Sequence, residues 1–108
     1  MKGGGGAGMG DLVRRAQEAQ KNLSKVQQDL RDRIVEASSG GGAVTAFVNG
    51  QQELVKLTIK REVVDPDDVA MLEDLVSAAV RQAIGESRRM MQEEMGKAMG
   101  GFKVPGLF

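Results

Sequence analysis

The hydrophobic period of this chain changes twice, from helical to alternating and back to helical. From Asp11 to about Arg33, apolar residues recur three or four positions apart, as on one face of a helix. Residues 34–63 instead contain runs in which apolar and polar residues alternate, as in half-buried strands. After Asp65 the helical period returns and persists to Met99. The sequence therefore predicts an α+β protomer of the order α-β-β-β-α, a three-stranded antiparallel sheet flanked by two long helices that pack together.

The first helical segment carries a narrow row of apolar residues, the apolar stripe. Its members lie within about 40° of one line at 100° per residue. They are Leu12, Ala16, Ala19, Leu23, Val26, Leu30, Ile34 and Ala37. Such a narrow stripe is typical of a helix that packs against another helix. We predict that Asp11 caps this helix and that it ends near Arg31 to Arg33.

Residues 34–63 predict three short strands. Ile34 to Ser38 fits the first strand, and a glycine-rich turn follows it. In the second strand, Val44, Ala46 and Val48 point to one face and Thr45 and Phe47 to the other. Asn49-Gly50 lies between two alternating runs and indicates a hairpin. The return strand is predicted from about Gln52 to Val63, with one face formed by Val55, Leu57 and Ile59.

A second long helix is predicted after the strands. Asp65 can cap it and Pro66 fits its first helical position. The outer half of this helix is apolar chiefly through Met90, Met91, Met95 and Met99, which suits an adaptable contact. We predict one domain over residues 11–99, between a flexible glycine-rich arm at 1–10 and a flexible tail at 100–108. The arm lacks the Lys-Ser/Thr pair that would make it a phosphate-binding loop.

The composition excludes several classes of function. The 108 residues contain no Cys and no His, which removes disulfides, thiolate chemistry and most zinc or haem sites. The adjacent carboxylates Asp67/Asp68 and Glu93/Glu94 diverge by about 100° on a helix and do not converge on one substrate. Helix capping explains the acidic run after Asp65 better than a cation site does. We therefore expect no enzyme, no cofactor and no bound metal.

Charge is distributed unevenly, although the formal total is zero. Residues 11–25 have a net charge of +2 and residues 81–99 a net charge of +1, whereas residues 65–80 carry five acids and no base. If the two helices pair antiparallel, the first half of one lies beside the second half of the other. Both basic segments then lie away from the acidic one. Such a separation gives a neutral protein a local surface for phosphate.

Several segments resemble the YbaB/EbfC family of nucleoid-associated proteins. The most specific are Val48-Asn49-Gly50, the block Leu72-Glu73-Asp74-Leu75-Val76 followed by Ala79, and the closing GFKVPG. The resemblance covers essentially the whole chain. It implies a homodimer with protruding helical arms, located in the bacterial cytoplasm on the nucleoid. It also implies binding to double-stranded DNA and effects on nucleoid organisation and gene expression.

Charge and position select the candidate DNA contacts, because the family pattern does not fix them. Arg14, Lys21 and Lys25 lie opposite the apolar stripe and Arg15 lies on its flank. The full set of candidates is Arg14, Arg15, Lys21, Lys25, Arg88, Arg89 and Lys97. On their own, such residues are also typical of an ordinary solvated helix face.

A protein partner remains as an alternative to DNA, and a membrane partner is disfavoured. The methionine row can dock a partner helix, which would make the chain an interaction module for repair or replication proteins without direct DNA binding. Binding of the same helix to a membrane surface is disfavoured, because Gly85 and Gly96 interrupt its apolar face. No run of about 18 apolar residues exists, so we expect no membrane partner.

Overall fold

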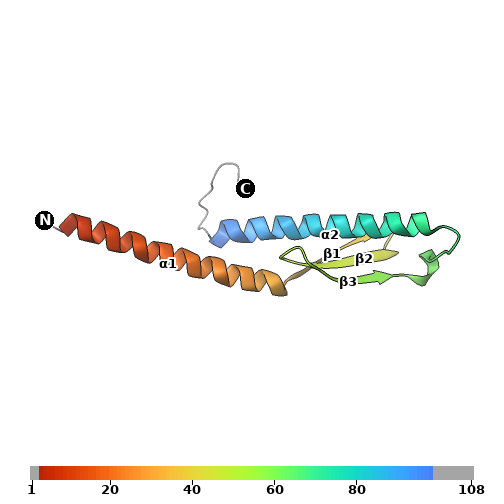
Figure 1. The fold of residues 1–108 in the computed structure, drawn as a ribbon, viewed down its shortest axis with the longest axis horizontal. Coiled ribbons are helices and arrows are strands. Elements are labelled where there is room, and N and C mark those ends of the chain that lie inside the picture. Colours follow the sequence, from red (N-terminus) through yellow and green to blue (C-terminus); the bar gives the residue numbers. More distant parts are fainter. Residues whose placement is uncertain (1–2, 99–108) are drawn as a thin grey trace.

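The computed structural model describes residues 3–98, with side chains from residue 8 onward (Figure 1). The main elements are α1 (Gly3–Asp32), β1 (Ile34–Ser39), β2 (Val44–Asn49), β3 (Leu54–Ile59) and α2 (Val69–Ala98), with a single 3₁₀ turn, η1 (Arg61–Val63), before α2. The predicted α-β-β-β-α order is confirmed. The predicted tail at 100–108 and Met99 lie outside the described residues.

The three strands form an antiparallel meander with β2 in the centre. Val44, Ala46 and Val48 are completely buried, as the alternation predicted. They face α2, whose Ala79 and Ala83 are also completely buried in the same cluster. Alanine has the smallest side chain that still favours a helix, so these two residues let α2 lie close to the sheet. The core therefore sits between α2 and one face of the sheet.

Strand β3 is shorter than the sequence predicted, six residues instead of the span from Gln52 to Val63. Its last residue, Ile59, pairs with Val44, the first residue of β2, so beyond this point β3 has no neighbouring strand to continue the ladder. The chain then turns through η1. A register shift between Phe47 and Val48 also leaves Val55 56% exposed on this edge strand, although Leu57 packs against the core as predicted.

Helix α2 begins three residues later than predicted. The Asp65 carboxylate accepts the Asp67 N–H at 2.9 Å, and the Asp65 carbonyl accepts the Asp68 N–H at 3.0 Å, so the first acid shapes a turn. The Asp68 carboxylate then accepts the Met71 N–H at 3.2 Å. Asp68 is therefore the cap, and the prediction of Asp65 as cap with Pro66 as the first helical residue is wrong.

Helix α1 ends at Asp32, as predicted, but begins at Gly3. Asp11 lies inside the helix instead of capping it. Residues 3–10, predicted as a flexible arm, thus have helical backbone. Extending an existing helix adds one hydrogen bond per residue, which offsets part of the entropy that glycine loses.

The molecule is elongated, with principal extents of 81 × 25 × 16 Å. Figure 1 shows the N-terminal half of α1 projecting past the C-terminal end of α2. Contact between the helices lies near the other end of α1, where Leu30 is 2% exposed and an Arg33 guanidinium nitrogen is 2.6 Å from a Glu94 carboxylate oxygen. The prediction that the first half of α1 lies beside α2 is therefore wrong.

Candidate nucleic-acid interface

The projecting part of α1, residues 3–25, is called the arm below. Every residue from Leu12 to Asn22 is exposed. These include the stripe residues Leu12, Ala16 and Ala19, whereas Leu23, farther along the stripe, is half-buried. Leu12 keeps 64% of its surface exposed, and the neighbouring Val13 keeps 51%. Within the single chain, the arm therefore has two open faces, one apolar and one polar.

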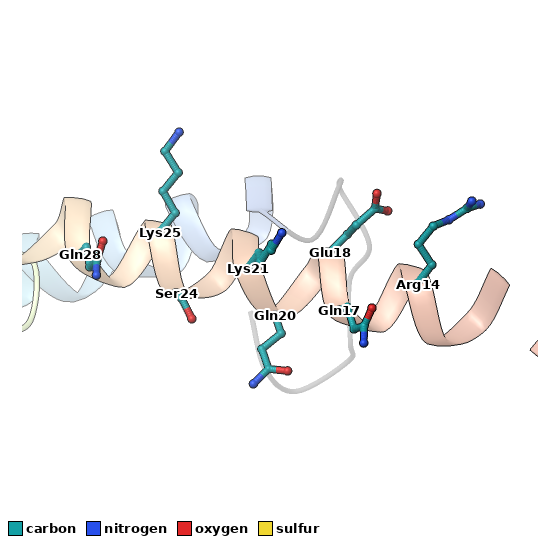
Figure 2. A pocket seen from close by; sticks show the side chains of 8 residues that line it. All are labelled: Arg14, Gln17, Glu18, Gln20, Lys21, Ser24, Lys25 and Gln28. Atoms are coloured by element: carbon teal, nitrogen blue, oxygen red, sulfur yellow. The ribbon is translucent and has the colours of Figure 1, made fainter. Parts of the chain in front are cut away.

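Three cations follow one line along the polar face, and we call Arg14, Lys21 and Lys25 the basic stripe. Arg14 and Lys25 are eleven residues apart, which is roughly 17 Å along the helix axis. Figure 2 shows Arg14, Lys25 and the intervening Glu18 extending from the same side of α1. The predicted clustering of these cations opposite the apolar stripe is what the helix geometry produces.

Uncharged polar side chains border the basic stripe. An open groove along this face is lined by Arg14, Gln17, Glu18, Gln20, Lys21, Ser24, Lys25 and Gln28. In Figure 2, Gln17, Gln20 and Ser24 extend to the other side from Arg14 and Lys25. Amide and hydroxyl groups commonly donate to phosphate and sugar oxygens in DNA complexes. Sequence reasoning did not select these residues, although their helical spacing from Lys21 was available as a signal.

The arginines at the outer end of the arm are paired with one acid. Arg14 and Arg15 lie 2.6 and 3.0 Å from the two Asp11 carboxylate oxygens. Both guanidinium groups are highly exposed, and an exposed ion pair contributes little. Among residues 8–98, Lys21 and Lys25 make no ion pair. The basic stripe is therefore accessible to an anion from solvent.

The α2 candidates are placed differently. Arg89 pairs with Glu86, and the Lys97 ammonium lies 3.6 Å from Glu94, which also binds Arg33. The hydrogen bond from Arg33, with a smaller contribution from Lys97, holds the pKa of Glu94 below its ordinary value against a partial opposing effect of desolvation. No α2 cation lines the groove on the arm. Within the single chain, the α1 candidates thus lie together on the arm, whereas Arg88, Arg89 and Lys97 lie apart from them on α2.

The methionine row of α2 packs largely within the chain. Met90 is buried and Met91 and Met95 are half-buried. Met91 and Met95 lie around a small hollow that also involves Leu30 and Gly50. The surface required by the alternative interaction module is therefore partly occupied by contacts to α1 and the hairpin.

The described part of the chain shows neither a metal site nor a membrane-spanning helix. Residues 3–98 contain no group of three or more acidic side chains placed to hold a metal ion. None of the helices in that range is long and apolar enough to cross a bilayer.

Residues 4–102 match the YbaB/EbfC DNA-binding family. The chain belongs to this family. A nucleoid-associated protein of Caldanaerobacter subterraneus subsp. tengcongensis is 49% identical over 109 residues, covering 99% of this chain and 98% of that protein. One from Alkaliphilus metalliredigens is 47% identical over 105 residues, covering 97% and 92%.

A solved structure supports the fold. The crystal structure of an uncharacterized protein from Helicobacter pylori is similar with a TM-score of 0.58 and 25% sequence identity. The similarity covers 79% of this chain and 93% of the Helicobacter chain. The family resemblance inferred from the sequence motifs is confirmed.

Proposed function

We propose that this chain is a nucleoid-associated protein that binds double-stranded DNA as a homodimer, with little sequence specificity. Its arms contact backbone phosphates and contribute to nucleoid organisation and gene expression. The observation that carries the proposal is the basic stripe, three exposed cations in line on a helix that projects beyond the rest of the chain. The contact residues proposed are Arg14, Arg15, Lys21 and Lys25 on the arm, with Arg88, Arg89 and Lys97 on α2.

Low specificity follows from the chemistry of the arm. Lysine and arginine on an exposed helix neutralise phosphates, which are the same for every sequence. The chain has no Trp and no Tyr, and its described part has one phenylalanine, Phe47, which lies under Lys56 in the sheet. Base stacking therefore contributes nothing on the arm, and counterion release supplies the affinity.

A second copy of the chain is proposed as the partner that completes the molecule. The described chain leaves large apolar side chains uncovered on two elements, including Leu12 and Val13 on the arm and Leu54 and Val55 on β3. A chain of 11.5 kDa with such an elongated shape buries only a small core by itself. Association covers part of this apolar surface and brings two basic stripes into one particle.

The test is a salt titration of DNA affinity. Fluorescence anisotropy with a duplex of about two helical turns is measured across a range of salt concentrations. With about four to six phosphate contacts per dimer, log K against log salt has a slope near −4 to −5. A second duplex of unrelated sequence and equal length serves as the control and binds with a similar Kd. Affinity that does not respond to salt contradicts the proposal.

A further inference from the structure

We infer that the tip of the β2–β3 hairpin, residues 49–53, fixes the direction in which the arm leaves the protein. The effect of arm direction on DNA binding rests on the proposed function, whereas the effect of the hairpin tip on arm direction does not. The tip lies between the C-terminal end of α1 and the middle of α2, and it bonds to both. On the α1 side, the Gly50 N–H donates to the Leu30 carbonyl at 2.7 Å. The Gln51 side-chain amide donates to the Gln27 carbonyl at 3.1 Å.

Gly50 is required by this contact and not by the shape of the turn. Its φ is not positive; the left-handed residue of the tip is Gln52, with φ 63°. A Cβ atom at position 50 would lie 2.5 Å from the Leu30 carbonyl oxygen and 2.8 Å from the Leu30 Cβ. The first of these neighbours is backbone and cannot move aside by a rotamer change. Any side chain at position 50 therefore has to displace the base of α1.

The other side of the tip is bonded to α2 through Ser87. The completely buried Ser87 hydroxyl donates to the Asn49 carbonyl at 2.5 Å. The Gln52 side-chain amide donates to the same hydroxyl at 3.1 Å. The second bond anchors the side chain of Gln52, a residue whose left-handed backbone conformation is unfavourable when a side chain is present.

The tip itself is a small rigid unit. The Asn49 side-chain oxygen accepts the N–H groups of Gln51 and Glu53 at 2.9 and 3.1 Å. The Asn49 amide nitrogen donates to the Glu53 carboxylate at 2.7 Å. A continuous set of bonds thus runs from α2 through Ser87, Asn49 and Gly50 to α1.

The length of the arm amplifies any change at this point. Arg14 is sixteen residues from Leu30, roughly 24 Å along the helix axis. If α1 rotates by about 10° around Leu30, Arg14 at the far end of this segment of roughly 24 Å therefore moves by about 4 Å. Such a displacement is larger than a hydrogen bond to a phosphate tolerates. Gly50 and Ser87 are therefore positioning residues for the basic stripe.

The experiment measures arm direction and DNA binding separately. The chain has no Cys, so cysteines introduced at the exposed positions Asn22 and Gln82 are the sole sites for spin labels. Distances within one chain are measured by pulsed electron paramagnetic resonance, with labelled protein diluted into excess unlabelled protein. The variants are Gly50→Ala, Ser87→Ala and the control Gly85→Ala, because a Cβ at Gly85 meets nothing within 4 Å.

We expect Gly50→Ala and Ser87→Ala to shift or broaden the distance distribution and Gly85→Ala to leave it unchanged. If each displaced arm loses one phosphate contact, the magnitude of the salt slope falls by about 2 per dimer. Unchanged distances in folded Gly50→Ala or Ser87→Ala protein overturn the inference, as does an equal change in the control. Where Gly50→Ala does not fold, Ser87→Ala decides. Altered distances with unchanged DNA affinity overturn the functional consequence, and absence of DNA binding by the unmodified protein refutes the proposed function alone.

Discussion

The two ends of α1 carry the same apolar pattern but meet different surroundings. Leu30, at the base, is 2% exposed against the hairpin and α2, whereas Leu12, in the arm, is 64% exposed. Both residues belong to the same stripe in the sequence. A helical period therefore identifies which face of a helix packs, but not whether the partner belongs to the same chain. In this protein the sheet, α2 and the base of α1, called the body below, contain the buried residues, whereas the arm leaves apolar and basic surfaces exposed.

Truncating the same side chain at the two ends gives the largest expected difference. Leu30→Ala removes buried methylene groups and leaves a cavity, so we expect it to lower the free energy of unfolding by about 2–5 kcal/mol. Leu12→Ala changes an exposed residue, and at low protein concentration we expect a loss below about 0.5 kcal/mol. Urea unfolding followed by circular dichroism measures both values.

Protein concentration sharpens this comparison. If a second chain covers the arm, the effect of Leu12→Ala grows with concentration, because association stabilises the folded state by mass action. An equal loss for the two variants at every concentration would show that both ends are packed to the same degree within one chain.

Replacing one glycine by alanine in each region is expected to have a smaller effect than Leu30→Ala and to stabilise the helix instead of destabilising the protein. A Cβ at Gly10 or at Gly85 meets nothing within 4 Å. Alanine in a helix interior is favoured over glycine by about 0.5–1 kcal/mol, so Gly85→Ala raises the free energy of unfolding by that amount. Gly10→Ala increases the helical signal of the arm without moving the main transition. A shift of the main transition by Gly10→Ala would show that arm and body unfold as one unit.

The smallest effect concerns the Arg33–Glu94 ion pair at the junction of the two regions. The folded pKa of Glu94 is lowered from its ordinary 4.5, so the stabilisation by its charge is fully present above that value and is lost as the pH falls through the folded pKa. Glu94→Gln therefore destabilises the protein at neutral pH, and its difference from the unmodified protein disappears in acid. The matched control is Glu93→Gln, since Glu93 makes no ion pair within residues 8–98. Equal pH dependence in the two variants would contradict this assignment.

Sequence periodicity predicts the body of the fold well. The alternation of Val44, Ala46 and Val48 identifies the buried face of β2, and the change of period after Arg33 gives the end of α1 to within one residue. These features depend on neighbours a few positions away. Local pattern and tertiary structure therefore agree.

The prediction is less accurate where distant contacts decide the structure, or where the local pattern fits more than one arrangement. Asn49-Gly50 marks the hairpin correctly, but the requirement for glycine comes from the Leu30 carbonyl, twenty positions earlier in the chain. Asp65 and Asp68, three positions apart, both fit a helix cap, and the turn formed by the first assigns the cap to the second. Of the residues that line the groove on the arm, only the cations Arg14, Lys21 and Lys25 were selected from the sequence, because glutamine and serine have no distinctive pattern on an exposed helix.

The most direct test of the arm as the DNA-binding region is a matched pair of charge reversals. One variant reverses the basic stripe, Arg14, Lys21 and Lys25, to Glu; the other reverses Lys60, Arg61 and Arg81, which lie outside the arm. Each lowers the formal charge from zero to minus six, so long-range repulsion of DNA is matched. The account predicts that the first variant stays folded and binds duplex DNA about 100-fold more weakly at low salt, with a much smaller loss in the second. Equal losses in the two variants, or unchanged affinity in the first, would contradict it.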